Sequence, residues 1–358
     1  MQSYVKFISK LFLRSFVLVF FIMLGLVFIL NILTELDFFR KTENVESYLP
    51  LYLSAINTPS HVFEMFPFIF LLSTQLFFIN LINDNQIQIF KYSGLKNTKI
   101  LLILSILTFI ISTVLVTIFY NASANLKNFY LELKSNYTTD DKYLAVITKN
   151  GLWIKDKIDN KTLIIKATKI DQNFLVDCFI SIFDENYNII KNIKSDKIDI
   201  TKNEWEIYEA RVFEDNYKKR LDKIYLKTSF NYKLIQSLFS NLSSLSLPKL
   251  FELKKNYELL NYSTTEISIQ IQKLISYPVY LMLMTILSGI IMFNIKSYGN
   301  PTLMISIGLF LSVIIYYISN FFHVLGNTEK IPIILSVWIP IIVLATSNSL
   351  MMIKINEK

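Results

Sequence analysis

Six long runs of apolar residues constrain the fold of this 358-residue chain more than any other feature. None of them contains Asp, Glu, Lys or Arg, and each is close to or above the roughly 20 residues that a helix needs to cross a bilayer. The runs are Ser15–Thr34, Met65–Asn83, Ile100–Leu126, Leu274–Ile295, Pro301–Phe322 and Ile331–Ile353. Six such runs are far more typical of a membrane protein than of a buried helical core, so the sequence predicts six transmembrane helices.

The composition excludes several other classes of protein. The chain is 53% hydrophobic and only 18% charged, which is more apolar than a disordered chain or an average soluble enzyme. The single cysteine, Cys178, excludes an intramolecular disulfide and a cysteine-cluster zinc site. The two histidines, His61 and His323, leave little for metal binding. The net charge of +8 reflects a Lys-rich composition as much as function. A basic chain can bind nucleic acid or anionic lipid; the membrane spans favour lipid, and we expect no nucleic acid partner.

Basic residues in the short loops predict the orientation of the chain, because such residues collect on the cytoplasmic side. If the spans alternate, the basic residues that flank them fall on one side: Lys6, Lys10, Arg14, Lys91, Lys96, Lys99, Lys296, Lys354 and Lys358. The loop after the first span is instead rich in acidic residues. We therefore expect both termini in the cytoplasm and the long polar region between the third and fourth spans outside it.

That polar region is typical of an all-β domain. The expected strands include Leu144–Thr148, Leu152–Lys155, Thr162–Ile170, Val176–Phe183, Glu204–Phe213 and Asp222–Lys227, with turns at Lys149–Gly151 and Asp184–Asn186. Val176, Cys178, Ile180 and Ile182 should share one face of a strand. Seven or eight short strands suggest a sandwich or jellyroll, with Trp153 and Trp205 in its core. A helix beginning near Pro248 should return the chain to the membrane.

These expectations give three parts and a fold class. Residues 1–127 hold the first three transmembrane helices, residues 128–270 the jellyroll-like β domain with its helical return, and residues 271–358 the last three helices. The fold class is a six-helix membrane protein with an all-β periplasmic domain inserted between helices 3 and 4.

Sequence motifs for catalysis are missing. The chain has no P-loop, no H-E-x-x-H, no G-x-S-x-G and no Cys/His ligand pair. The spans carry almost no ionisable residues, which disfavours a proton-coupled carrier. We therefore expect no catalytic residue, no metal site and no cofactor. Four kinds of protein remain open: a subunit driven by another chain, a receptor, an adhesin or an assembly factor.

The loop after the second span predicts a short cytoplasmic helix at about residues 84–95. Ile87, Phe90 and Leu95 form one apolar side, and Gly94 stands where a helix would stop. Such a helix either fits a groove of a partner protein or lies on the membrane surface. Spacing alone favours the membrane surface.

At these residues the chain resembles the LptF/LptG (YjgP/YjgQ) lipopolysaccharide export permease family. Gln86-Ile-Gln-Ile-Phe-Lys-Tyr-Ser-Gly94 is similar to the family's coupling loop, with Gln86 for a Glu and Lys91 for an Arg. Phe63–Leu72, Gly151–Lys155, Asn203–Tyr208 and Ile331–Pro340 resemble further family segments in the same order. Leu36–Lys41 and the region of Pro59 are more similar to LptG than to LptF.

The resemblance implies a transport mechanism. An LptF-like and an LptG-like permease pair in the inner membrane of a Gram-negative bacterium, and an LptB-like ATPase dimer binds their coupling helices. ATP is used by that partner, which drives lipopolysaccharide from the outer leaflet into the jellyrolls and onward to LptC-like and LptA-like proteins. Here the coupling residues would be Gln86, Ile87, Phe90, Lys91 and Gly94.

The resemblance also implies which residues would bind the substrate. Arg40 and Lys41, past the outer end of the first span, are candidates to bind lipid A phosphates, and Lys127 is a further candidate; interfacial snorkelling is the simpler reading. Thr34 and Ser60 stand where the family often has basic residues, which implies fewer phosphate contacts. Phe28, Ile32, Leu309 and Val313, on spans one and five, are spaced to line the cavity.

Two alternative functions stay open at this point. One is another lipid or lipoprotein export permease, for which four spans per subunit would be expected. The other is a membrane-anchored periplasmic sensor or adhesion protein without an ATPase partner.

Overall fold

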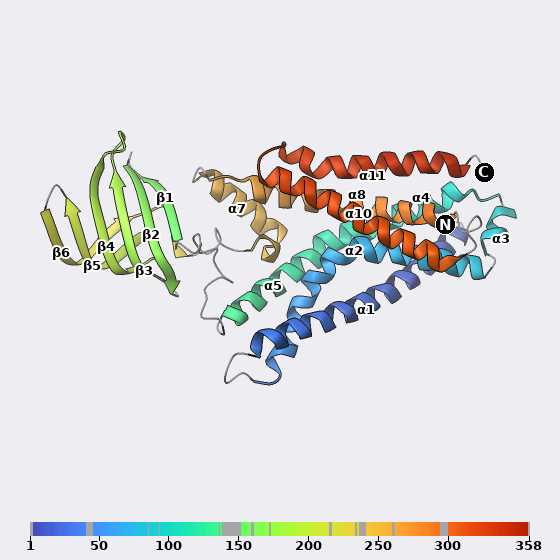
Figure 1. The fold of residues 1–358 in the computed structure, drawn as a ribbon, viewed down its shortest axis with the longest axis horizontal. Helices are drawn as coiled ribbons and strands as arrows, with labels where there is room; N and C mark the ends of the chain where they lie inside the picture. The colour runs from blue at the N-terminus through green and yellow to red at the C-terminus, as the bar shows by residue number, and fades with distance from the viewer. Residues whose placement is uncertain are drawn as a thin grey trace. The chain divides into compact units, whose positions relative to one another are not determined.

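The structure is a computed structural model, and it describes residues 3–40, 46–84, 86–92, 94–135, 137, 152–158, 161–171, 173–214, 217–232, 235, 241–259, 262–293 and 300–356. The chain forms two compact units (Figure 1). The helical unit comprises Met1–Lys127, Ser246–Phe251 and Thr264–Lys358, and the β unit comprises Asn128–Leu245 and Glu252–Ser263.

Six helices in the described residues are long and apolar enough to cross a membrane, which confirms the prediction. They are α1 (Ser3–Phe39), α2 (Leu49–Asn83), α4 (Asn97–Val114) continuing through η1 (Leu115–Phe119) into α5 (Tyr120–Ser135), α8 (Thr265–Phe293), α10 (Pro301–Asn327) and α11 (Ile333–Asn356). Several extend past their apolar runs. The 37 residues of α1 span about 55 Å, well beyond a hydrocarbon core of about 30 Å.

The centre of the helical unit is built from α2 and α8, whose most apolar stretches are 61% and 67% buried. Buried polar side chains join the helices around them. Ser288 Oγ donates to the Leu71 carbonyl at 2.8 Å, and Asn348 Nδ2 donates to the Leu283 carbonyl at 2.9 Å. Lipid gives no hydrophobic drive for helix association, so small residues and such hydrogen bonds fix the packing.

In the part of the β unit that the structure describes, six strands form an antiparallel sheet in the order β1 to β6. The strands are β1 (Leu152–Ile158), β2 (Lys161–Asp171), β3 (Phe174–Phe183), β4 (Ile189–Asp199), β5 (Glu204–Glu214) and β6 (Tyr217–Lys227). The all-β prediction is confirmed. Among the described residues, every strand pairs with its neighbour in sequence, so the six strands form a meander. The predicted strand Leu144–Thr148 and the turn Lys149–Gly151 lie outside the described residues.

The core of the β unit covers one face of this sheet. Trp205 is fully buried there, as predicted, and its Nε1 donates to the Phe230 carbonyl at 2.8 Å. The prediction for Trp153 is wrong, because its side chain is 54% exposed on the edge strand β1. Of the four residues predicted to share one face of β3, Cys178, Ile180 and Ile182 are buried there, but Val176 is only half-buried.

The backbone conformation of β3 explains why Val176 is not buried. Asp177 has a positive φ of 49°, which breaks the alternation of faces along the strand. Leu175, rather than Val176, therefore joins Cys178 on the buried face. The predicted turn at Asp184 is confirmed: its Oδ1 accepts hydrogen bonds from the backbone N–H groups of Asn186 and Asn188 at 2.9 and 2.7 Å. These bonds lower the pKa of the Asp184 carboxyl, the one from Asn188 most.

Helix α7 (Leu247–Leu259) follows the sheet. Its start agrees with the prediction from Pro248, since proline is tolerated in the first turn, where backbone N–H groups have no partner within the helix.

Candidate functional site

The loop between α2 and α4 forms α3 (Gln86–Tyr92), so the predicted short helix exists but is shorter than residues 84–95. Gly94 has a φ of +74°, the left-handed conformation that ends helices. The Leu95 N–H donates to the Phe90 carbonyl at 2.9 Å, which is the bond that closes a Schellman cap. Gly94 thus ends α3 as the spacing predicted.

The apolar side of α3 faces the protein. Phe90 is 9% exposed, and its ring packs edge-on against Phe7 of α1 with 6.0 Å between the ring centroids. Leu95 is 8% exposed. The opposite side carries Ile89 and Tyr92, which are 53% and 89% exposed. Phe90 therefore anchors the helix, and Ile89 with Tyr92 forms its exposed surface, which we call the α3 outer face.

Less of the structure is described for the other coupling candidates, Gln86, Ile87 and Lys91. Gln86 is half-buried at the start of α3. Ile87 and Lys91 belong to the helix, but their side chains lie outside the described part of the structure. Sequence reasoning missed Ile89 and Tyr92, because a seven-residue helix shows too little periodicity to tell which apolar side faces the protein.

Helices α1 and α10 have the most exposed apolar surfaces of the six. Only 11% of the most apolar stretch of α1 and 17% of that of α10 are buried. Both pack against α2, while the described residues of α1 and α10 make at most slight contact with each other. Their C-terminal ends run apart in Figure 1. Since the spans of a lone chain are surrounded by lipid, these surfaces are available to a second chain or to an amphipathic substrate.

The predicted lining residues lie on these two helices, at different depths. Phe28, Ile32 and Leu309 are half-buried, and Val313 is 42% exposed. Sequence reasoning missed the most exposed apolar side chains. They are Phe21, Ile29, Leu30 and Leu33 on α1 and Phe310, Tyr317 and Phe321 on α10. A helix that is apolar all round gives no signal for the face that remains uncovered.

Ionisable residues from four helices come together in the helical unit. Lys127 of α5 and Lys273 of α8 both interact electrostatically with Glu64 of α2. His61 interacts with Glu64 and Lys127, and His323 of α10 interacts with Lys273. We call these five residues the polar cluster. His61 and Glu64 stand three positions apart on α2, and the other three are single ionisable residues at the margins of apolar runs, so only the folded chain brings the four helices' residues into one cluster.

Of the remaining phosphate candidates, Arg40 is exposed at the C-terminal end of α1. Lys41 lies outside the described residues. The structure thus adds Lys273 to the basic side chains that sequence reasoning named.

Within the described residues, no group of three or more His, Cys, Asp or Glu side chains is placed to hold a metal ion. The arrangement offers apolar surface, a mixed-charge cluster and an exposed helix face, all of which suit binding and movement. These features define the class: a multi-span membrane protein with a β domain inserted between its third and fourth spans. The chain belongs to the family described as "Lipopolysaccharide export system permease LptF/LptG", whose model matches residues 6–354.

The family match confirms the resemblance found in the sequence, and it does not separate LptF from LptG. A search among curated proteins found no match.

Proposed function

We propose that the chain is one permease subunit of an ABC-type exporter that takes lipopolysaccharide from the outer leaflet of the inner membrane to a periplasmic bridge. The observation that carries this proposal is the pair of exposed apolar surfaces on α1 and α10 in a chain that matches the permease family from residue 6 to 354. A substrate with several acyl chains needs an apolar path of this kind.

The energy comes from a separate, LptB-like ATPase dimer, and the chain itself is a non-catalytic subunit without a cofactor. The α3 outer face supports this part of the proposal. Ile89 and Tyr92 project from a helix that Phe90 and the Gly94 cap hold in place. Exposed apolar side chains on an anchored helix are suited to a groove in a partner.

Copurification of the ATPase tests the proposal. Ile89→Asp should abolish copurification while leaving the melting temperature of the permease unchanged, because Ile89 is exposed. Phe90→Asp is the matched comparison: it should lower both, because it places a carboxylate at a buried position. Normal recovery of the ATPase with the Ile89→Asp protein would refute the coupling role of α3.

The phosphates of the substrate would meet basic residues near the outer ends of the spans. Arg40, Lys41 and Lys127 are the proposed contacts, with Lys273 added because it shares Glu64 with Lys127. The carboxylate of Glu64 would attract the ammonium groups of Lys127 and Lys273 when no phosphate is bound. Arg40→Glu combined with Lys41→Glu should reduce copurified lipopolysaccharide, whereas Lys202→Glu in the β unit should not.

The remaining partners follow the same proposal. A second permease of the family pairs with this chain, and LptC-like and LptA-like proteins continue the path from the β unit. The termini are cytoplasmic and the β unit is periplasmic. Six candidate spans disfavour a lipoprotein-export permease, for which four were expected, and a sensor or adhesion protein would not need an α3 outer face.

A further inference from the structure

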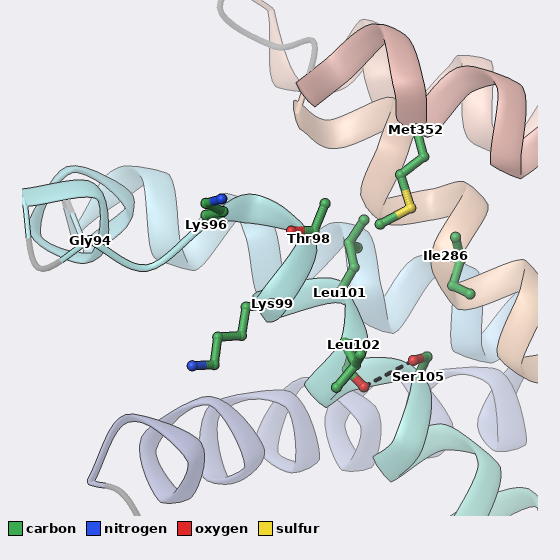
Figure 2. A pocket seen from close by; sticks show the side chains of 9 residues that line it. All are labelled: Gly94, Lys96, Thr98, Lys99, Leu101, Leu102, Ser105, Ile286 and Met352. Atoms are coloured by element: carbon green, nitrogen blue, oxygen red, sulfur yellow. Dashed lines mark hydrogen bonds between the residues drawn. The ribbon is translucent and has the colours of Figure 1, made fainter. Parts of the chain in front are cut away.

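One pocket of the helical unit has no lining residue from α1 or α10. It has a volume of about 560 Å³, which is ample for a lipid acyl chain, and is formed by α4, α8, α11 and the loop before α4. Its lining consists of Gly94, Lys96, Thr98, Lys99, Leu101, Leu102, Ser105, Ile286 and Met352. Figure 2 shows Met352 and Ile286 reaching in from α11 and α8, with Leu101, Leu102 and Ser105 on α4. Most of the lining is therefore apolar.

The basic side chains are confined to one end of this pocket. Lys96 directly precedes α4, and Lys99 lies in its first turn. Lys99 Nζ is 5.5 Å from the centroid of the Tyr4 ring, and neither lysine forms an ion pair in the part of the chain that the structure describes. Two ammonium groups on flexible side chains at the mouth of an apolar pocket are suited to a phosphate that carries an acyl chain.

The length of the pocket also suits a lipid. Lys96 and Ser105 are nine positions apart, which corresponds to about 13 Å along α4. Half of the hydrocarbon core of a bilayer is about 15 Å thick. The lining thus extends over a length close to the thickness of one leaflet.

We propose that this pocket binds an anionic glycerophospholipid from the cytoplasmic leaflet, with its phosphate at Lys96 and Lys99 and one acyl chain against Leu102, Ile286 and Met352. The choice of leaflet rests on the orientation given under the proposed function; the pocket itself does not take part in export. The cytoplasmic leaflet is rich in anionic lipid, which attracts lysines near the membrane surface. Because Gly94, the cap residue of α3, also lines the pocket, the bound lipid stabilises the segment that joins α3 to α4.

Photocrosslinking tests this proposal. The full chain, purified with its partners, is placed in phosphatidylcholine nanodiscs that contain a trace of phosphatidylglycerol with a photoreactive acyl chain. Mass spectrometry should find the crosslinks at Leu102, Ile286 and Met352. Lys96→Gln combined with Lys99→Gln should lower labelling about 25-fold, since each lysine near an anionic headgroup is worth a factor of about five in affinity.

Two further variants separate charge from shape. Lys6→Gln combined with Lys10→Gln removes the same charge from the N-terminal end of α1, outside the pocket, and should leave labelling unchanged. Ser105→Trp fills the pocket without changing its charge and should also abolish labelling.

Four results would overturn the proposal. Equal labelling by photoreactive phosphatidylcholine would show that the pocket is an apolar surface without preference for an anionic headgroup. Competition by inorganic phosphate would show that it is a site for small anions and not for a lipid. Displacement by lipopolysaccharide would assign the pocket to the transported substrate, and labelling of a partner chain in place of Leu102, Ile286 and Met352 would show that a partner covers the pocket. None of these measurements depends on ATPase binding, so a failure of the coupling role of α3 would be seen separately.

Discussion

At the scale of single residues, Cys178 offers a direct measure of the order of the β unit. Burial raises the pKa of its thiol to about 12, and the neighbouring Asp177 carboxylate adds to this effect. Its side chain is 1% exposed. A thiolate is the species that reacts with maleimides, so the folded chain should be almost inert at pH 8. The label should enter only when the β unit unfolds.

The same thiol makes stability depend on pH in a predictable direction. An unfolded cysteine loses its proton near pH 8.5, whereas the folded Cys178 keeps its proton to about pH 12. The contribution of the thiol to the free energy of unfolding is therefore fully present below about pH 8.5. It is lost progressively as the pH rises from about 8.5 to about 12. We expect maleimide labelling of the full chain to be slow at pH 8 and to become complete in denaturant. Rapid labelling under native conditions would contradict the buried position.

At the scale of elements, the contact between α10 and α2 depends on Gly308. A Cβ atom at this position would lie 2.1 Å from Gln75 Nε2, which donates to the Met304 carbonyl at 3.0 Å. Gly308→Ala should therefore displace the Gln75 amide, which is 1% exposed, and leave a buried polar group unpaired. We expect a loss of about 1–3 kcal/mol in stability, measured as a lower melting temperature in detergent.

Gly25 on α1 is the matched control. A Cβ atom there would have no neighbour within 4 Å. Gly25→Ala should leave the melting temperature unchanged or raise it slightly, because alanine favours a helix by up to about 1 kcal/mol over glycine. Equal effects of the two substitutions would show that Gly308 is not a close-packing position.

The elements also show how far sequence reasoning reaches. Charge-free runs located all six long helices, and Gly94 marked the end of α3, because solvation and backbone conformation act locally. The wrong predictions concern choices that only the folded chain makes. The positive φ at Asp177 exchanged Leu175 for Val176 in the core, and Trp153 stayed exposed on β1. The polar cluster could not be predicted, since His61, Lys273 and His323 lie far apart in sequence.

At the scale of the whole molecule, the proposed orientation rests on charge alone and is open to a direct test. The chain has one cysteine, so Cys178→Ser gives a cysteine-free background. Lys202→Cys then places a thiol at an exposed position between β4 and β5, and Tyr92→Cys places one on the α3 outer face, which is 89% exposed at that residue. Both side chains are exposed in the isolated chain, so the membrane decides which of them an impermeant reagent reaches unless a partner covers the site.

A membrane-impermeant maleimide added to spheroplasts should label Lys202→Cys and not Tyr92→Cys, because the β unit is proposed to lie outside the cytoplasmic membrane and α3 inside. Breaking the cells should make Tyr92→Cys reactive, provided that the ATPase does not cover it; the additional change Ile89→Asp removes that protection. The reverse pattern would invert the chain. It would place the lysines around α3 and α4 on the outer side, against the rule that basic loops stay inside, and would separate the α3 outer face from any ATP-driven partner.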